Sequence, residues 1–357
     1  MHKSFFDMRA VYECGWNIFN RKGFSDDPKD ISVNYNYLDH LSQAGINWLV
    51  VFWTNANGFD KSWVDASKYA HSLGIKLARG FYGFCGGGPE YTMTEPNAPE
   101  HLLRDTKWGP KMSVCPFEDE ARQWMVSLLP KRLEPDIDGI FIEPAREISR
   151  NCICPRCQKL LPYKWDVHVL NFLADEIHKI KPEAEVIPYL NMNESGEDKQ
   201  KWAKELKALR KEIHHIFAWG MDNDETLFDW LEAEPRFEHF AKLGRILLFP
   251  EGKKPQKSIE ERVSSVFKWC RMAADRGKKG YMFDYRVFGG REWKGHENDE
   301  PCTRISHRVP ASLMLAGKAM QNPYLDEKEQ SEFIQELRGI TDWDLDDQEY
   351  FYRGIDS

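Results

Sequence analysis

Short apolar runs alternate with longer amphipathic runs along most of the chain. Each apolar run is bounded by Gly, Pro or Asn, which is typical of strands buried on both faces. The longer runs follow helical spacing, as Val169, Phe172, Leu173 and Ile177 show by forming one apolar stripe. The pattern predicts eight strands, at Met8 to Glu13, Ile46 to Thr54, Ile75 to Tyr82, Ile137 to Glu143, Glu185 to Asn191, Ile213 to Trp219, Arg245 to Pro250 and Gly280 to Tyr285.

Eight repeats of strand and helix predict an α/β protein built as a single (β/α)8 TIM barrel. A doubly wound open sheet is the competing architecture, but no glycine-rich nucleotide-binding fingerprint follows the first strand. The run from Gly86 to Gly88 after the third strand has no helix directly behind it. We therefore expect a catalytic barrel at residues 1–323 and a C-terminal helical extension at residues 324–357 that packs on the barrel.

Composition narrows the classes of function. The chain has 357 residues, and no apolar run approaches the ~20 residues that a membrane span needs, so we expect no membrane partner. A formal net charge of -8 disfavours nucleic acid as a partner, and an aromatic content of 13% excludes intrinsic disorder. Residues Met1 to Asp7 lack the apolar segment of a secretory signal, so we expect a cytoplasmic protein unless a signal has been removed.

Polar and aromatic residues gather where the predicted strands end. In TIM barrels the carboxyl ends of the strands form the catalytic face. Carboxylates and amides bind sugar hydroxyls, and indole or phenol rings stack on the apolar face of a sugar, so this inventory predicts a carbohydrate substrate. The predicted substrate-binding residues are Glu13, Trp16, Asn17, Trp53, Asn55, Arg79, Tyr82, Arg146, Tyr189, Asn191, Trp219, Asp222, Tyr285 and Arg286.

A glycoside hydrolase also needs two catalytic carboxyl groups, one acting as acid and one as nucleophile or base. Glu143 ends the buried run that begins at Asp138, and we take it as the first, although an ion pair with a neighbouring arginine is the structural alternative. Glu251 and Asp284 compete for the second role. The leading hypothesis is hydrolysis of an oligosaccharide or glycoside. A carbohydrate-binding barrel without activity is the alternative, and a metal-dependent lyase or hydrolase ranks last.

Three cysteines lie together in Cys152-Ile153-Cys154-Pro155-Arg156-Cys157. The C-x-C-x2-C spacing is typical of a zinc site, whereas reduced thiols in a loop are the alternative. A structural zinc site needs a fourth ligand, for which Cys115 and Cys85 are the candidates. Cys115 falls in the loop adjacent to Cys152–Cys157 on the barrel, so we predict structural Zn2+ bound by Cys115, Cys152, Cys154 and Cys157, bracing the loop beside Glu143. No organic cofactor is expected.

Two stretches of the chain carry a resemblance to known barrels. Val114-Cys115-Pro116, the helix from Glu118, Asp138 to Phe141 and the cysteine cluster together resemble uncharacterised glycoside-hydrolase-like barrels with cysteines after strand four. The segment from Ala316 to Asp326 resembles the closing helix of α-glucuronidase-like and hexosaminidase-like barrels. The resemblance implies a sugar-cleaving enzyme with Glu143 at the acid position. The Asp-Glu pair of hexosaminidases is absent, because Ile142 precedes Glu143, and this argues against hydrolysis assisted by an N-acetyl group. The Asn-Glu pair typical of the large retaining clan is absent for the same reason, which weakens the case for Glu251 as nucleophile.

Overall fold

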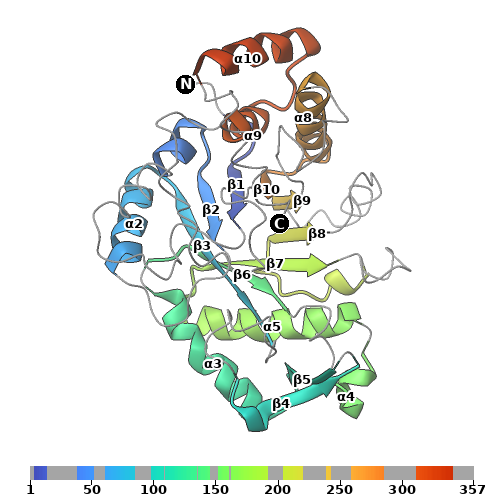
Figure 1. Ribbon diagram of the computed structural model, residues 1–357. Coiled ribbons are helices and arrows are strands. Elements are labelled where there is room, and N and C mark those ends of the chain that lie inside the picture. The colour runs from blue at the N-terminus through green and yellow to red at the C-terminus, as the bar shows by residue number, and fades with distance from the viewer. Residues whose placement is uncertain are drawn as a thin grey trace, which may run out of the picture. The chain divides into compact units, whose positions relative to one another are not determined.

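The computed structural model of the protein describes residues 4–13, 38–51, 61–84, 98–107, 109–134, 136–144, 152–160, 162–191, 204–219, 239–242, 259–284 and 311–340. Its parallel strands form a barrel-like sheet, and they are labelled in Figure 1. The strands of this sheet are β1 (Met8–Glu13), β2 (Trp48–Val51), β3 (Lys76–Tyr82), β6 (Gly139–Glu143), β7 (Glu185–Asn191), β8 (His215–Trp219), β9 (His239–Lys242) and β10 (Gly280–Asp284). Their order is β1-β10-β9-β8-β7-β6-β3-β2, which is a TIM-barrel-like fold, as predicted.

The chain forms two compact units. Unit one comprises residues 1–51, 61–76 and 239–357, and unit two comprises residues 52–60 and 77–238. In unit one, β1 lies between β10 and β2 and pairs in parallel with both. The helices of this unit are α2 (Lys61–Ser72), α8 (Ile259–Asp275), α9 (Ala311–Gln321) and α10 (Glu327–Ile340). Phe267 of α8 meets Phe333 of α10 edge to face at 6.4 Å. The domain boundary expected after residue 323 stays a prediction.

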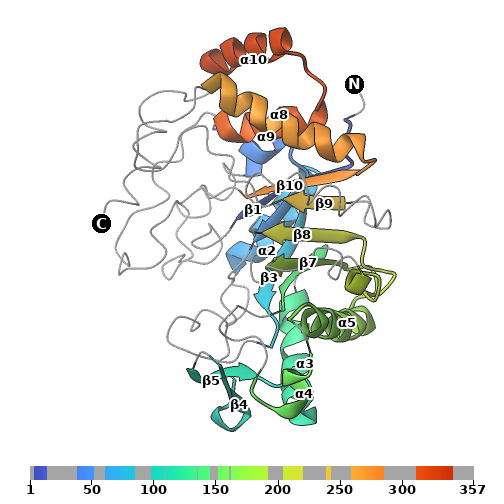
Figure 2. The same cartoon turned by 90° about the vertical axis from the view of Figure 1, so that its right-hand side faces the viewer.

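Unit two contains β3 from Leu77 onwards, β6, β7 and β8, paired in parallel wherever their register is defined. Its helices are α3 (Asp119–Leu133), α4 (Pro155–Gln158) and α5 (Pro162–Ile180), with a short 3-10 helix at Glu100–Leu102. An antiparallel hairpin of β4 (Leu103–Thr106) and β5 (Gly109–Val114) follows the 3-10 helix. Both views show this hairpin beside α4 (Figures 1 and 2).

Contacts between β3 and α3 show which face of the sheet in unit two is covered by helices. The guanidinium group of Arg79 donates a hydrogen bond to the Lys131 carbonyl of α3 at 3.2 Å, and Arg132 of α3 lies 4.3 Å from the Phe81 ring. The odd-numbered residues of β3 therefore face the helices. Because side chains alternate along a strand, Tyr82 faces the barrel interior, and its register partner Glu143 does so too.

Several predicted elements are confirmed at nearly their predicted bounds. β1 and β7 match the sequence prediction, and β6, β8 and β10 differ from it by one or two residues at one end. The β4–β5 hairpin was not predicted. The seventh barrel strand is β9, which lies before the predicted run at Arg245 to Pro250, and that run falls outside the described residues. Among the described helices, none combines the length and hydropathy that crossing a membrane requires.

Candidate active site and cysteine cluster

Glu143 stands at the carboxyl end of β6, in a row with two tyrosines of unit two. Tyr82 is its register partner on β3, and the Gly83 amide donates a 2.7 Å hydrogen bond to the Glu143 carbonyl. On the other side, Ile142 pairs with the residue before Tyr189, so Tyr189 stands at the level of Glu143 on β7. The structure therefore brings three of the predicted site residues together at one edge of the sheet.

The backbone beneath Glu143 is held rigidly. Phe141, two residues earlier on the same face, is fully buried, and its ring lies 5.7 Å from Tyr189 and 5.2 Å from Phe217. Tyr82 and Tyr189 are themselves buried, whereas Glu143 is half-buried. A carboxyl group with partial access to solvent on a rigid strand is suited to proton transfer, and the two buried tyrosines flank it on the neighbouring strands.

Other predicted residues lie at strand ends, each within its own unit. Glu13 is the last residue of β1 and Asp284 the last of β10, where Asp284 pairs with Tyr12. Asn191 ends β7 and pairs with Trp219 at the end of β8. The sequence analysis did not single out Tyr12, although it follows the same strand-end rule. Trp16, Asn17, Trp53, Asn55, Arg146, Asp222, Glu251, Tyr285 and Arg286 lie outside the described residues.

Arg79 requires a correction. The sequence analysis placed it at the rim with the sugar-binding residues, but it lies in the middle of β3 and is only 1% exposed. Its side chain points toward α3, on the opposite side of the sheet from Tyr82. Burial lowers the pKa of Arg79 well below its usual value, and the neighbouring charge of Arg132 adds to this effect. Arg79 thus belongs to the packing between strand and helix and does not face the predicted substrate.

The four predicted cysteine ligands form a tight cluster in unit two. The sulfur of Cys115 lies 3.6 Å from that of Cys154 and 3.9 Å from that of Cys157, and the Cys152 and Cys157 sulfurs are 3.5 Å apart. All four sulfurs lie within 4.8 Å of one another, and they make up the group with metal-binding geometry found among the described residues. Cys115 is confirmed as the cysteine that joins the three clustered in sequence, while Cys85 lies outside the described part of the chain.

Local structure explains how the C-x-C-x2-C segment presents three sulfurs to one point. Cys154 caps α4, with its sulfur accepting a hydrogen bond from the Cys157 amide at 3.3 Å. Pro155 occupies the first helical turn, where its missing amide is no loss. The side-chain amide of Gln158 donates to the Cys152 carbonyl at 3.0 Å and closes the loop.

Three thiols of the cluster, those of Cys115, Cys152 and Cys157, shift one another's pKa. Hydrogen bonds from Cys152 and Cys157 hold the pKa of the Cys115 thiol well below its usual value. Contact with Cys115 in turn raises the pKa of both Cys152 and Cys157. The Cys115 thiolate is therefore favoured, and it opposes ionisation of Cys152 and Cys157.

Comparisons with known proteins were made for sequence and for structure. No known family model and no curated protein matches the sequence. Solved structures do match the fold. The β-N-acetylhexosaminidase of Bacteroides fragilis NCTC 9343 gives a TM-score of 0.60 at 12% identity, over 98% of this chain and 73% of that one. The chitobiase of Flavobacterium johnsoniae gives 0.58 at 12% identity, over 99% of this chain and 53% of that one. A Bacteroidetes-affiliated GH5 cellulase gives a TM-score of 0.53 at 11% identity, over 92% of this chain and 95% of that one.

The chain has a TIM-barrel-like fold, which it shares with these solved structures. At these identities the likeness establishes the fold. The chain spans about half the length of the chitobiase that it matches.

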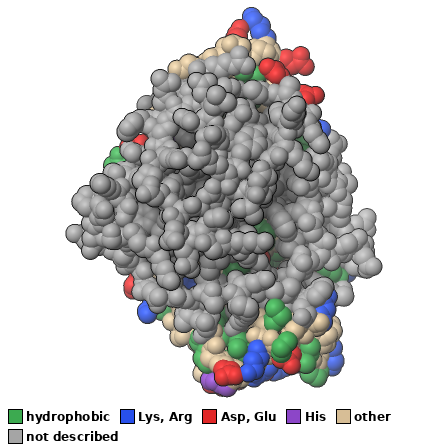
Figure 3. Space-filling view, in the orientation of Figure 1, with side chains coloured by type: hydrophobic (Ala, Val, Ile, Leu, Met, Phe, Trp, Pro, Cys, Tyr) green, Lys and Arg blue, Asp and Glu red, His purple; other side chains and the backbone are tan. Residues whose placement is uncertain are grey.

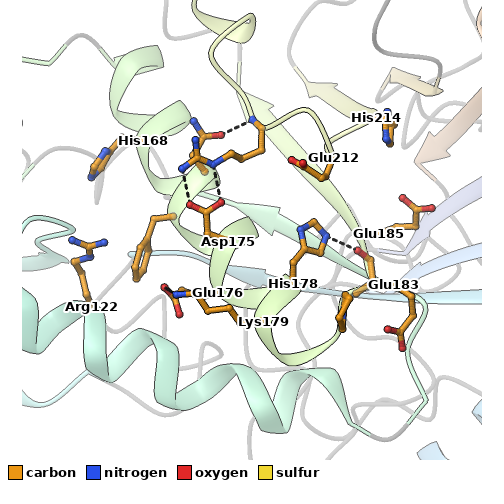
Figure 4. A pocket seen from close by; sticks show the side chains of 15 residues that line it. Arg122, His168, Asp175, Glu176, His178, Lys179, Glu183, Glu185, Glu212 and His214 are labelled. Carbon is orange, nitrogen blue, oxygen red and sulfur yellow. Dashed lines mark hydrogen bonds and ion pairs between the residues drawn. The ribbon is translucent and has the colours of Figure 1, made fainter.

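A groove of about 990 Å³ lies on the helical side of the sheet in unit two, at the amino end of β7 (Figure 4). Two ion pairs join residues that line it. Arg210 binds both carboxylate oxygens of Asp175, at 2.7 and 2.6 Å, and Lys179 lies 2.6 Å from Glu176. None of the predicted site residues lines this groove. Its position at the start of β7 separates it from Tyr189 near the strand's carboxyl end.

The hairpin beside the cysteines is fastened to the start of α3 by an ion pair: Arg104 of β4 binds both carboxylate oxygens of Glu118, at 2.9 and 2.5 Å. The 3-10 helix before the hairpin also contacts α3, with the His101 ring 2.7 Å from the Glu120 carboxylate. The described side chains visible at the lower end of the space-filling view accordingly mix acidic, basic and hydrophobic types (Figure 3). Cys115 sits between the hairpin and α3, so these contacts fix its place in the cluster.

Proposed function

We propose that the protein is a glycoside hydrolase in which Glu143 is the acid/base catalyst. The observation that carries the proposal is the placement of Glu143, half-buried at the carboxyl end of β6 between Tyr82 and Tyr189. This is the end of the strands at which TIM-barrel enzymes carry their chemistry. The hexosaminidase, the chitobiase and the cellulase that share the fold are named as enzymes of carbohydrates, which agrees with the proposal.

The mechanism is dictated by the requirements of glycosidic bond cleavage. The leaving oxygen must receive a proton while positive charge develops on the sugar ring, and a second carboxylate must act as nucleophile or activate water. Glu143 would donate the proton to the leaving oxygen. Where the second carboxylate acts as nucleophile, Glu143 would then take a proton from the water that hydrolyses the glycosyl-enzyme, and where the second carboxylate activates water, that carboxylate takes the proton. Tyr82 and Tyr189, on the strands beside β6, would flank the bound sugar. Asp284 and Glu251 remain the candidates for the second carboxylate, and Asp284 ends β10.

The residue before Glu143 takes no part in this chemistry. Ile142 pairs with Phe81 and, like it, faces the helices as a buried side chain. The chain therefore has no acidic residue adjacent to Glu143 of the kind that assists the acetamido group in hexosaminidases. We accordingly propose a substrate without a requirement for an N-acetyl group.

A panel of p-nitrophenyl glycosides carrying neutral, acetamido and uronic acid sugars tests the proposal. We expect the protein to hydrolyse at least one of them, and Glu143→Gln to lower kcat by about 10²- to 10⁴-fold. The loss should be smaller for a dinitrophenyl glycoside of the same sugar, because a better leaving group needs less protonation. Unchanged turnover in Glu143→Gln would refute the role of Glu143.

Glu185→Gln is the matched control. Glu185 is also a glutamate at a strand terminus, but it starts β7 and binds His215 at 2.9 Å. We expect this variant to keep wild-type kcat and KM. If the protein binds sugars of the panel and cleaves none of them, it is a carbohydrate-binding barrel and the proposed activity is wrong.

A further inference from the structure

We propose that Cys115, Cys152, Cys154 and Cys157 bind one tetrahedral zinc ion, and that this zinc centre positions the end of β6 that carries Glu143. The first part concerns the cysteines alone. The second part rests on the proposed function, because it assigns the zinc centre a role in turnover.

The spacing of the sulfurs fits a metal ion. Four Zn–S bonds of about 2.3 Å in tetrahedral geometry place the sulfurs about 3.8 Å apart. Three of the six sulfur–sulfur separations, 3.5, 3.6 and 3.9 Å, bracket that value, and all six are within 4.8 Å. They are far longer than the S–S bond of about 2.05 Å in a disulfide. The side chains are thus already arranged as a coordination shell.

The type of metal follows from the donors. Four thiolates select zinc or iron among the common metals. Cys115, Cys152 and Cys157 are fully buried and Cys154 is half-buried, so no ligand position is left open to water. A closed shell of four cysteines is the usual structural zinc site and not a site that activates water. Zinc also suits a site whose purpose is to hold segments together without redox chemistry.

A short backbone path leads from the cysteines to Glu143. The amide of Val114, next to Cys115, donates to the Phe84 carbonyl at 3.2 Å. The amide of Phe84 donates to the Pro144 carbonyl at 3.0 Å, and that of Gly83 to the Glu143 carbonyl at 2.7 Å. These three hydrogen bonds join the cysteine-bearing segment, the end of β3 and the end of β6.

A second backbone connection joins the segment of Cys152 to Cys157 to the hairpin. The amide of Ile153, between two of the cysteines, donates to the Asp105 carbonyl of the hairpin at 2.9 Å. The zinc ion would therefore link Cys115, which follows the hairpin, to the three cysteines that come after β6 in the chain. The end of β6 would then be held through the three hydrogen bonds that connect it to the segment bearing Cys115.

Metal analysis of the purified full-length protein tests the first part. We expect about one zinc per chain by mass spectrometry. Cys154→Ser removes the most accessible ligand and should abolish stoichiometric zinc. Cys270→Ala, a buried cysteine of α8 outside the cluster, should keep it. Absence of metal from a folded protein, or iron in place of zinc, would overturn the assignment.

Hydrogen exchange and kinetics test the second part. Removing zinc from the wild-type protein with a chelator should speed exchange at the amides of Gly83, Phe84 and Val114, a readout independent of activity. It should lower kcat by roughly 10- to 100-fold with little change in KM, because misplacement of a catalytic group by about 1 Å has that effect. Readdition of zinc should restore both measurements.

A substitution separates positioning from general loss of structure. Cys154→His keeps a zinc-binding side chain and should retain zinc and most of kcat, whereas Cys154→Ser should lose both. Unchanged exchange and kcat after zinc removal would overturn the positioning role while leaving the zinc site intact. Zinc binding in a protein without glycosidase activity would refute the proposed function and, with it, the role in turnover, but not the metal site.

Discussion

Gly83 is the residue whose replacement tests most directly whether the end of β6 is held as described. It follows β3 and lies beside the end of β6, with its amide bound to the Glu143 carbonyl. A Cβ atom placed on Gly83 would lie 2.6 Å from the Pro144 carbonyl oxygen, 3.2 Å from Val169 and 3.3 Å from Leu173. Its backbone is not among those with positive φ. Glycine is therefore required for space and not for conformation.

The size of the effect of Gly83→Ala can be worked out from these distances. A relaxed C···O contact needs about 3.3 Å, so the Pro144 carbonyl must move by about 0.7 Å or the strand must shift. Overpacking of this kind costs about 1–3 kcal/mol of stability. Pro144 directly follows Glu143, so the carboxylate should be displaced by a similar distance, and we expect kcat to fall by roughly 10- to 100-fold.

The assay for Gly83→Ala is thermal unfolding followed by steady-state kinetics on the best glycoside of the panel. Gly339→Ala is the matched control, because a Cβ at Gly339 in α10 meets nothing within 4 Å. That variant should be stabilised by about 0.5–1 kcal/mol and keep its kcat. If Gly83→Ala unfolds at the wild-type temperature and retains full kcat, the close approach of Pro144 does not exist and the argument fails.

Two further predictions concern stability alone. Phe141→Ala empties a fully buried site between two aromatic rings and should lower the free energy of unfolding by about 3–5 kcal/mol, measured by calorimetry. Phe5→Ala replaces a side chain that is 41% exposed and should cost far less. Equal losses in the two variants would contradict the packing described. Arg210→Ala should give a small loss at neutral pH, because hydrogen bonding to Arg210 lowers the pKa of Asp175 in the folded state. That contribution is present above the unfolded pKa of about 3.9 and is lost as pH falls through the lower folded value, so the two unfolding temperatures should converge in acid. A difference that persists at pH values of about 2 would refute this interpretation.

The strands that were predicted well share one property. β1, β6, β7 and β10 are short, mostly apolar runs with clear breaks at both ends, as parallel strands covered on both sides must be. The β4–β5 hairpin was missed because its residues, Leu103 to Thr106 and Gly109 to Val114, are mostly polar and only partly buried. β9 was missed for a similar reason, since His239–Lys242 carries a basic residue at its end.

Some residues of the candidate site could likewise be predicted from the order of strands and loops, whereas the orientation of others is known only from the structure. Glu143 was predicted from its place at the end of a buried strand. Arg79 was misplaced because the strand-end rule was applied without the alternation of faces, and only the contact with α3 shows which face is which. The convergence of Cys115 with the C-x-C-x2-C segment was predicted from barrel topology, since neighbouring loops of one face are neighbours in space.

Glu143 is held in two different ways, by the packing of its own strand and by hydrogen bonds from a neighbouring segment. The strand supplies rigidity from below, through Phe141 and its aromatic neighbours, but its pairing ends at its last residue and cannot by itself restrain the loop beyond. Glu143 and Pro144 must therefore be restrained from outside the strand. The hydrogen bonds that reach them through Phe84 come from the segment that carries Cys115. A metal-bound cysteine cluster would be a suitable anchor there, because zinc coordination can stabilise a short, partly polar segment that has too little apolar surface to fix itself.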